Sequence, residues 1–140
     1  TYMNAKNGIL QKRAESEIAT EMCRKLRVKT PSYEKIVNQL SGGNQQKVII
    51  AKWLMMYPKV LILDEPTRGI DVGAKSEIYQ IMNELTEQGV SIIMISSDME
   101  EIMGMADRIL VMCEGKISGE LHKGEYTQEK ILEYAAEVKK

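Results

Sequence analysis

The chain has 140 residues, of which 44% are apolar and 28% charged, so it can build a globular core of its own. Its 19 basic and 20 acidic side chains leave a formal charge of −1, and no block of like charges indicates a nucleic-acid partner. The apolar runs are far shorter than the roughly 18 residues that cross a bilayer, and no signal peptide is recognisable.

The first residue and the cysteines indicate where the chain comes from. It begins at Thr1 rather than at Met, so we expect it to be part of a longer protein. Cys23 and Cys113 lie far apart without metal-ligand spacing. We therefore expect two reduced, partly buried thiols of a cytosolic protein.

The first part of the chain is predicted to be helical. Apolar residues at helical spacing predict an exposed amphipathic helix from Ile9 to Val28, which Thr30-Pro31 ends. A short helix is expected from Tyr33 to Gln39, and the turn Leu40–Gly43 opens a third helix that runs to about Met56. That helix is apolar on most sides and is expected to be buried through Val48, Ile49, Ile50, Trp53, Leu54 and Met55.

Strand and helix alternate in the rest of the chain, which is typical of an α/β sheet. The aliphatic run Val60–Leu63 predicts a strand covered on both faces. Asp71 is expected to cap a helix that ends at Gln88, with Gly89 after it. The further expected elements are a strand over Ser91–Ile95, a helix over Asp98–Gly104, a strand over Arg108–Met112, a turn at Gly115-Lys116, a strand over Ile117–Leu121, and a helix from Thr127 to about Val138. The predicted division is a helical subdomain, 1–57, followed by an α/β part, 58–140.

Leu40-Ser41-Gly42-Gly43-Asn44 could form an anion site. A hydroxyl and two glycines at the start of a helix present backbone N–H groups to a ligand, and the missing Cβ atoms allow close approach. The same residues also suit a turn that merely caps the helix.

Asp64-Glu65 follows the aliphatic strand, at the edge where open α/β sheets bind ligands. Asp64 could hold Mg²⁺, largely through water, and Glu65 could orient or deprotonate an attacking water. An exposed acidic pair that ends a strand is the alternative.

Together, LSGGNQQKV at Leu40–Val48 and VLILDEPTRGID at Val60–Asp71 resemble the signature motif, Walker B motif and D-loop of ATP-binding-cassette (ABC) ATPases. NQQKV and the stretch Arg68–Lys75 resemble, more narrowly, the second nucleotide-binding domain of bacterial sugar importers of the ribose, galactose and methylgalactoside type. The fold implied is the C-terminal part of an ABC-type P-loop NTPase domain, α/β, with a parallel sheet flanked by helices and an N-terminal helical subdomain.

The resemblance implies a role for each matching residue. Asp64 would serve Mg²⁺, Glu65 would be the catalytic base, and Asp71 would lie in the D-loop that links two ATP sites. Ser41 and the Gly43 N–H would touch the γ-phosphate of ATP bound across a dimer interface. Gln45 matches the usual glutamine loosely, because Asn44 occupies the expected position. The implied nucleotide-binding residues are Ser41, Gly42, Gly43, Asn44, Gln45 and Asp71.

Two departures from the family pattern stand out. Ser97 occupies the switch position, where a histidine normally contacts the γ-phosphate, so we expect weak hydrolysis at the site that contains Glu65. There is no G-x-x-x-x-G-K-[ST] phosphate loop, since Gly119 and Gly124 have its spacing but Glu125-Tyr126 follows. The loop is expected upstream of Thr1, and the chain alone is expected to be inactive.

The resemblance implies ATP and Mg²⁺ as cofactors and carbohydrate uptake as the function. The implied partners are integral membrane permease subunits, the other nucleotide-binding domain and, indirectly, a periplasmic sugar-binding protein, at the cytoplasmic face of the bacterial inner membrane. One alternative is a non-catalytic regulatory half-site that acts by dimerising. Another is a DNA-repair or chromosome ATPase, although the long coiled coils of that class have no counterpart here.

Several other residues have plainer interpretations. His122 is expected on the surface and Trp53 in the core. Met99, Met103 and Met105 are expected as adaptable core filler, with contact to the permease as the alternative. A solvated helix face, or a docking face for the membrane subunit, is expected from Lys12, Arg13, Arg24, Lys25 and Arg27.

Overall fold

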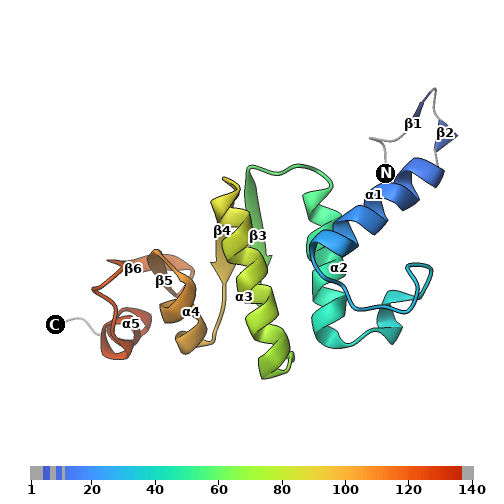
Figure 1. Cartoon of the computed structure of the whole chain (residues 1–140). Coiled ribbons are helices and arrows are strands. Elements are labelled where there is room, and N and C mark those ends of the chain that lie inside the picture. Colours follow the sequence, from blue (N-terminus) through green and yellow to red (C-terminus); the bar gives the residue numbers. More distant parts are fainter. Residues whose placement is uncertain (1–4, 7–8, 11, 137–140) are drawn as a thin grey trace. The chain divides into compact units, whose positions relative to one another are not determined.

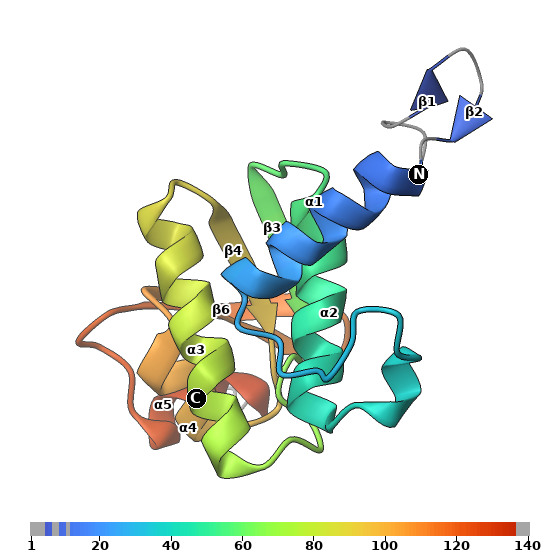
Figure 2. The ribbon, with the colours of Figure 1, turned by 45° about the vertical axis from the view of Figure 1, so that its right-hand side comes forward.

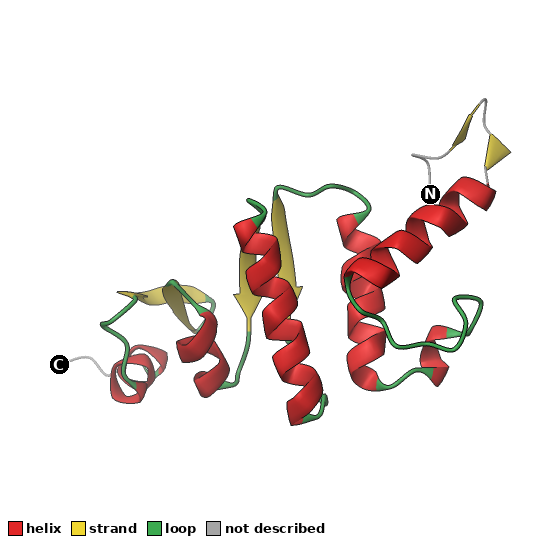
Figure 3. Ribbon diagram, in the orientation of Figure 1, coloured by secondary structure: helices red, strands yellow, loops and turns green. Residues whose placement is uncertain are grey.

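A computed structural model of the chain describes residues 5–6, 9–10 and 12–136 (Figure 1). Contacts divide the chain into two compact units, Thr1–Ile93 and Met94–Lys140. The elements of the first unit are β1 (Ala5–Lys6), β2 (Ile9–Leu10), α1 (Lys12–Lys25), the 3₁₀ helix η2 (Val37–Gln39), α2 (Gly42–Leu54), β3 (Val60–Asp64) and α3 (Val72–Glu87), and strand β4 (Ser91–Ile95) spans the boundary. The second unit continues with α4 (Met99–Met105), β5 (Arg108–Cys113), β6 (Lys116–His122) and α5 (Gln128–Ala135), as Figure 3 shows by type.

Helix α1 is shorter than the predicted helix at both ends. Ile9 pairs with Lys6 in the antiparallel β1–β2 hairpin, so it is not helical. At the other end Arg27 has a φ of 54°, and the Val28 N–H donates to the Cys23 carbonyl at 2.9 Å. A left-handed residue with this bond closes a helix as a Schellman cap, a position that usually holds glycine. Because Arg27 is not glycine, the sequence pattern missed this end.

The predicted helix over Tyr33–Gln39 is wrong, because only Val37–Gln39 is helical, as a 3₁₀ turn. Short polar side chains bond to the backbone just before it. The Thr30 hydroxyl donates to the Ser32 carbonyl at 2.6 Å, and the Ser32 hydroxyl oxygen accepts from the Glu34 N–H at 3.1 Å. Such bonds compete with helix formation.

Helix α2 is buried on one face only, which corrects the prediction of a buried helix that is apolar on most sides. The buried residues recur at helical spacing: Gly43, Lys47, Ile50, Ala51 and Leu54. Trp53 is 52% exposed, with the Lys52 ammonium 5.7 Å from its ring centroid, so the prediction of a core tryptophan is also wrong. In Figure 2, α1 crosses one end of α2 and α3 lies beside it, and both helices contact α2.

Strands β3 and β4 are hydrogen-bonded neighbours, and their arrows run in the same direction in Figure 1. The pairing begins where the Ser91 N–H donates to the Lys59 carbonyl at 2.9 Å. Along β3, Leu61 and Leu63 are buried, whereas Val60 and Ile62 are exposed. The expectation that both faces are covered is therefore wrong for this chain. Strand β4 has the predicted bounds, but Ile93 and Ile95 are about half exposed.

Helix α3 begins and ends as predicted from local signals. The Asp71 carboxylate accepts the Ala74 N–H at 2.9 Å, which is the bond of an N-cap. Gly89 follows the helix with a φ of 86°, a backbone angle that favours glycine. The helix turns its buried face inward through Ile78, Ile81, Met82 and Leu85.

In the second unit, α4 and α5 pack against the β5–β6 hairpin. Glu114 and Gly115 form the hairpin turn, and both have the positive φ that a type I′ turn requires. The turn therefore lies one residue earlier than the predicted Gly115-Lys116, because Lys116 is the first residue of β6. Thr127 caps α5 by accepting the Lys130 N–H, as predicted, while Val138 lies outside the described residues. The core consists of Ile109, Val111, Leu121 and Ile131, with Met99 and Met103 packed against it, which confirms the filler interpretation for these two methionines.

Gly119, Gly124 and His122 of this unit have structural or surface positions. Gly119 lies within β6, where a Cβ atom would come within 2.3 Å of the Tyr134 ring, so its small size serves packing. Gly124, with a φ of 92°, lies in the turn that follows. His122 is on the surface as expected, with its side chain 64% exposed.

Candidate functional site: the signature turn and the Walker B carboxylates

The amino end of α2 is open toward solvent. Ser41 is the N-cap residue, yet its side chain accepts no hydrogen bond from a backbone N–H of the first turn. Its hydroxyl oxygen instead accepts from the Asn44 side-chain amide at 2.8 Å. The first N–H groups of a helix have no intrahelical partner and carry partial positive charge. The N–H groups of residues 42 to 44 are therefore left for an anion.

The orientation of Asn44 is fixed from its other side. The Lys29 backbone N–H donates to Asn44 Oδ1 at 2.7 Å. A backbone N–H can only donate, so the atom facing it must be the amide oxygen, and the amide NH₂ must face Ser41. Gln45 is directed elsewhere, because its side-chain NH₂ donates to the Leu40 carbonyl at 2.8 Å and so braces the turn.

The two glycines of the turn differ in surroundings. Gly43 is buried, and a Cβ there would lie 2.6 Å from the Ala74 Cβ, well inside normal contact distance. A Cβ on Gly42 would find only the Gly69 carbonyl, at 3.9 Å. The glycine at 43 thus makes room for α3. The exposed glycine at 42 is the one where close approach of an anion is open.

A buried lysine joins α2 to α3. The Lys47 side chain is 2% exposed, and its ammonium contacts Glu77 Oε2 at 2.5 Å and the Arg27 carbonyl at 3.2 Å. The Lys29 ammonium contacts the other carboxylate oxygen of Glu77 at 2.9 Å. The hydrogen bond from Lys47, with that from Lys29, lowers the pKa of the Glu77 carboxyl to about 2.

Sequence reasoning missed Lys47. The available signal was a lysine at the centre of the apolar stripe of α2, four residues after Gly43 and three before Ile50. Two of the cations expected on a solvated face are paired with α3: the Lys25 ammonium donates to Gln88 and the Arg27 guanidinium to Glu84, each at 2.8 Å.

The Walker B residues end β3 as the sequence predicted. Asp64 is the last residue of the strand and is exposed. Glu65 is half-buried, with a φ of 47°, so the chain turns sharply there in a conformation uncommon for residues other than glycine. Pro66 and Thr67, which follow, are buried and anchor the turn. Asp64 thus has the extended backbone of a strand, whereas Glu65 has the left-handed backbone of a turn.

The D-loop segment lies against the signature turn. It folds as two tight turns, in which the Arg68 N–H donates to the Glu65 carbonyl and the Ile70 N–H to the Thr67 carbonyl, both at 3.2 Å. Its far end packs on α2 through the Gly43–Ala74 approach. The Asp71 carboxylate accepts the Ala74 N–H and so caps α3. The structure therefore brings the signature turn and the D-loop together.

Ser97, which the sequence places at the predicted switch position, belongs to the second unit. Ser97 is exposed, and its neighbour Ser96 is held on two sides. The Ser96 hydroxyl donates to the buried carboxylate of Glu101, and its oxygen accepts the Asp98 N–H at 3.0 Å. Sequence reasoning missed Glu101, whose only local signal was its position three residues after the capping Asp98.

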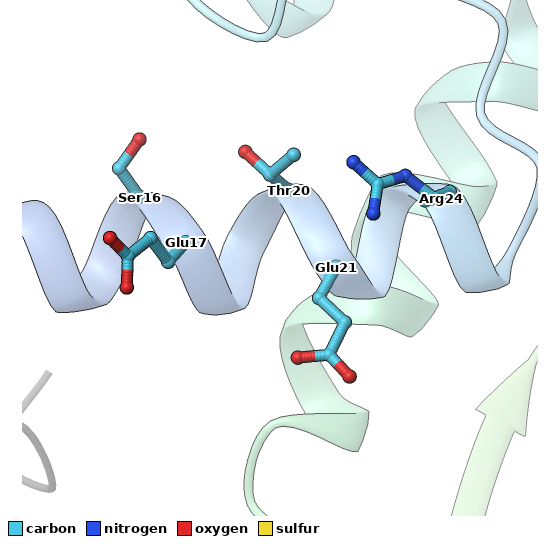
Figure 4. A pocket seen from close by; sticks show the side chains of 5 residues that line it. All are labelled: Ser16, Glu17, Thr20, Glu21 and Arg24. Atoms are coloured by element: carbon cyan, nitrogen blue, oxygen red, sulfur yellow. The ribbon is translucent and has the colours of Figure 1, made fainter.

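A shallow hollow lies on α1, lined by Ser16, Glu17, Thr20, Glu21 and Arg24 (Figure 4). All five side chains come from one helix, and the close-up shows them projecting outward rather than converging on a common point. None of the predicted site residues contributes to it. In the described part of the chain, no helix is both long enough and apolar enough to span a bilayer.

Comparison with known proteins shows what the chain is similar to. The family model for ABC transporters matches residues 2–68. The chain is 60% identical over 126 residues to the ribose import ATP-binding protein of Clostridium tetani, and 59% identical over 128 residues to that of Bacillus subtilis strain 168. The chain is therefore similar to ATP-binding proteins of ABC transporters. The predicted resemblance to sugar-import ATP-binding proteins is confirmed.

Solved ABC cassettes share the fold. A bacterial ABC transporter cassette solved as a dimer superposes with a TM-score of 0.71 at 25% identity, over 85% of this chain and 51% of the cassette. Another ABC cassette, from a second transporter, gives 0.72 at 26% identity, over 91% of this chain and 49% of that one. The predicted α/β fold of a P-loop NTPase part is confirmed. The chain spans about a quarter of the length of the ribose import proteins that it matches.

Proposed function

We propose that this chain supplies the signature, Walker B and D-loop residues of an ATP-binding subunit that couples ATP binding and hydrolysis to carbohydrate uptake. The observation that carries the proposal is the open amino end of α2, where Ser41 leaves the helix N–H groups uncapped. An uncapped helix start with an adjacent hydroxyl is suited to the terminal phosphate of a nucleotide. In the subunit, 1–57 would act as the helical subdomain and 58–140 as part of the nucleotide-binding core.

The signature turn would bind the γ-phosphate of ATP held mainly by the other nucleotide-binding domain. The N–H groups of Gly42, Gly43 and Asn44 would donate to phosphate oxygens, with the Ser41 hydroxyl beside them. Gln45 would brace the turn through the Leu40 carbonyl rather than touch the nucleotide. Asp71 would act in the D-loop by holding the first turn of α3 against Gly43.

The Walker B carboxylates would act at the second ATP site. Asp64, exposed at the end of β3, suits Mg²⁺ as one carboxylate beside water and phosphate oxygens, the ligand set this ion prefers. When bound, the ion would neutralise the charge that develops on the phosphates. Glu65 would orient and deprotonate the attacking water. Ser97 stands where the family usually has a histidine, and its short hydroxyl would support hydrolysis less well.

The partners are proposed from the relatives, whose names describe ribose import ATP-binding proteins. The subunit would dock on integral membrane permease subunits at the cytoplasmic face of the bacterial inner membrane, pair with the other nucleotide-binding domain, and serve a periplasmic sugar-binding protein. No block of positive charge in the sequence favours nucleic acid.

The test compares Ser41→Ala with Glu65→Gln in the full-length protein reconstituted with its permease. Removing a hydrogen bond to a charged group costs about 1.5–3 kcal/mol, so Ser41→Ala should lower kcat/KM for ATP about 10- to 100-fold. Glu65→Gln should reduce the total rate modestly, because its site also carries Ser97. Ser16→Ala, an exposed serine on α1, is the matched control. Equal losses from Ser41→Ala and Ser16→Ala would refute the proposal.

A regulatory half-site is the second candidate, and Ser97 at the switch position favours it. If the half that contains Glu65 does no hydrolysis, Glu65→Gln should leave both the ATPase rate and sugar uptake unchanged. If Glu65→Gln is instead as damaging as Ser41→Ala, this half carries a working hydrolytic site.

The 140 residues by themselves should not bind ATP appreciably. They contain no phosphate loop, whose N–H groups and lysine hold the β- and γ-phosphates in P-loop proteins. Calorimetric titration with Mg·ATP should give no micromolar binding. Micromolar affinity would contradict the expectation.

A further inference from the structure

We infer that Asn44, anchored by Lys29, Lys47 and Glu77, is a positioning residue that directs the hydroxyl hydrogen of Ser41 toward the bound phosphate. The inference rests on the proposed function of the signature turn and deepens it. In this inference Asn44 and the three residues that anchor it together keep the O–H bond of Ser41 pointing outward.

The first step concerns the hydroxyl itself. Asn44 donates to Ser41 Oγ at 2.8 Å, so this oxygen acts as the acceptor on that side. The hydrogen of the hydroxyl cannot also point at an NH₂ group, since both would be donors. It must point elsewhere, and the exposed side of Ser41 lies at the open start of α2. The serine is thereby a prepared donor for a phosphate, which only accepts.

The second step concerns what holds Asn44. The Lys29 backbone N–H meets Asn44 Oδ1 at 2.7 Å, which prevents the amide from turning over. Were it to turn, two donors would face each other at Lys29, and the amide oxygen would face Ser41. The hydroxyl hydrogen would then be drawn inward toward that oxygen. One backbone N–H therefore decides which way the serine donates.

The third step concerns what holds Lys29 in place. The segment 27–29 is tied to α2 by the Lys47 ammonium on the Arg27 carbonyl, and to α3 by Glu77, which accepts from both Lys29 and Lys47. The Lys47–Glu77 bond is the firm one, because Lys47 is 2% exposed, whereas the Lys29 ammonium is largely in solvent. The helix that begins at the D-loop thus supports the signature serine through a continuous hydrogen-bonded network.

A double-mutant cycle in the full-length protein with its permease tests the inference. Ser41→Ala, Asn44→Ala and the double variant are compared by kcat/KM for ATP. If Asn44 acts through the Ser41 hydroxyl, Asn44→Ala alone should cost up to the 10- to 100-fold of Ser41→Ala, and the double variant should match Ser41→Ala within about twofold. ADP affinity should be unchanged in all three, because ADP has no γ-phosphate. A merely structural residue would weaken ADP and ATP alike.

Glu77→Gln provides a second cycle with Ser41→Ala, should Asn44→Ala fold poorly. Glu77 is 41% exposed at its side chain, and glutamine has the same shape as glutamate, so the change introduces no steric conflict. The decrease in kcat/KM for ATP that Glu77→Gln causes should likewise disappear when Ser41 is already replaced by alanine. If Asn44→Ala or Glu77→Gln costs the same factor with and without the Ser41 hydroxyl, the positioning role is overturned while the proposed function stands. If Ser41→Ala itself has no effect, both are overturned.

Discussion

At the amino end of α2, a network of hydrogen bonds from three segments of this chain supports one turn, whereas along β3 every second side chain faces solvent. Around Ser41 the bonds come from Asn44, from the Lys29 backbone and, through Glu77, from α3. On β3, Val60 and Ile62 are 52% and 63% exposed. The hydrogen bonds that support the first region all come from this chain, whereas the strand of the second region has only one face covered.

The comparison separates two kinds of functional residue. The signature turn takes its geometry from polar contacts made inside this chain, so substitutions there should act on the chain itself. The Walker B carboxylates depend on a strand whose outer face has apolar side chains in solvent, so their final geometry should depend on whatever covers that face in the full-length protein. Four predictions test this division, beginning with the largest expected effect.

Gly43→Val should be the most damaging of these changes to the signature region. A Cβ at residue 43 would lie 2.6 Å from that of Ala74, so α2 and α3 must separate, at a cost of about 3 kcal/mol. Amide hydrogen exchange of α2 in the full-length protein should rise accordingly. The matched control is Gly42→Ala, where the nearest atom is at 3.9 Å. Similar exchange in the two variants would contradict the packing role of Gly43.

Glu77→Gln should come second. It leaves the ammonium of Lys47 buried without its carboxylate, which costs about 2 kcal/mol, less than for a fully buried pair because Glu77 is partly exposed. Glu84→Gln is the control, since it breaks an exposed pair with Arg27 and should cost under about 1 kcal/mol. Urea unfolding of the full-length protein compares them. Equal midpoints would show that burial of Lys47 does not matter.

Acid should remove the stabilisation from Glu77 in a defined window. Its pKa is about 2 in the folded chain against an ordinary 4.5, so the folded state favours the ionised carboxyl. The contribution is present above pH 4.5 and is lost as the pH falls toward 2. The stability difference between the wild type and Glu77→Gln should therefore shrink over that interval. A constant difference between pH 4.5 and 2 would contradict the ion pair.

Ile62→Val should have the smallest effect and is the most direct test of the open face. Removing a methylene from a buried site costs about 1 kcal/mol, and from a site exposed by 63% almost nothing. We expect the full cost in the full-length protein, with Ile36→Val, at a residue 64% exposed in the turn before η2, as the control. If neither variant changes the unfolding midpoint, the outer face of β3 is exposed in the full-length protein too.

The sequence by itself determined the motifs and several features that depend on near neighbours. Asp71 and Thr127 cap their helices as predicted, because each accepts an N–H group only three residues along the chain. The aliphatic run and Asp64-Glu65 predicted a strand and its ligand edge in the same way. These features needed no knowledge of distant residues.

Only the tertiary structure decided which distant residues pack against the motifs and which side chains they pair with. Lys47 finds its carboxylate 30 positions along the chain, and Gly43 owes its small size to Ala74 on another helix. The exposure of Trp53 and the left-handed turn at Arg27 likewise depend on how α1, α2 and α3 meet. Burial and pairing are set by residues far apart in sequence, so periodicity could predict that α2 is a helix but not that its buried face holds a lysine.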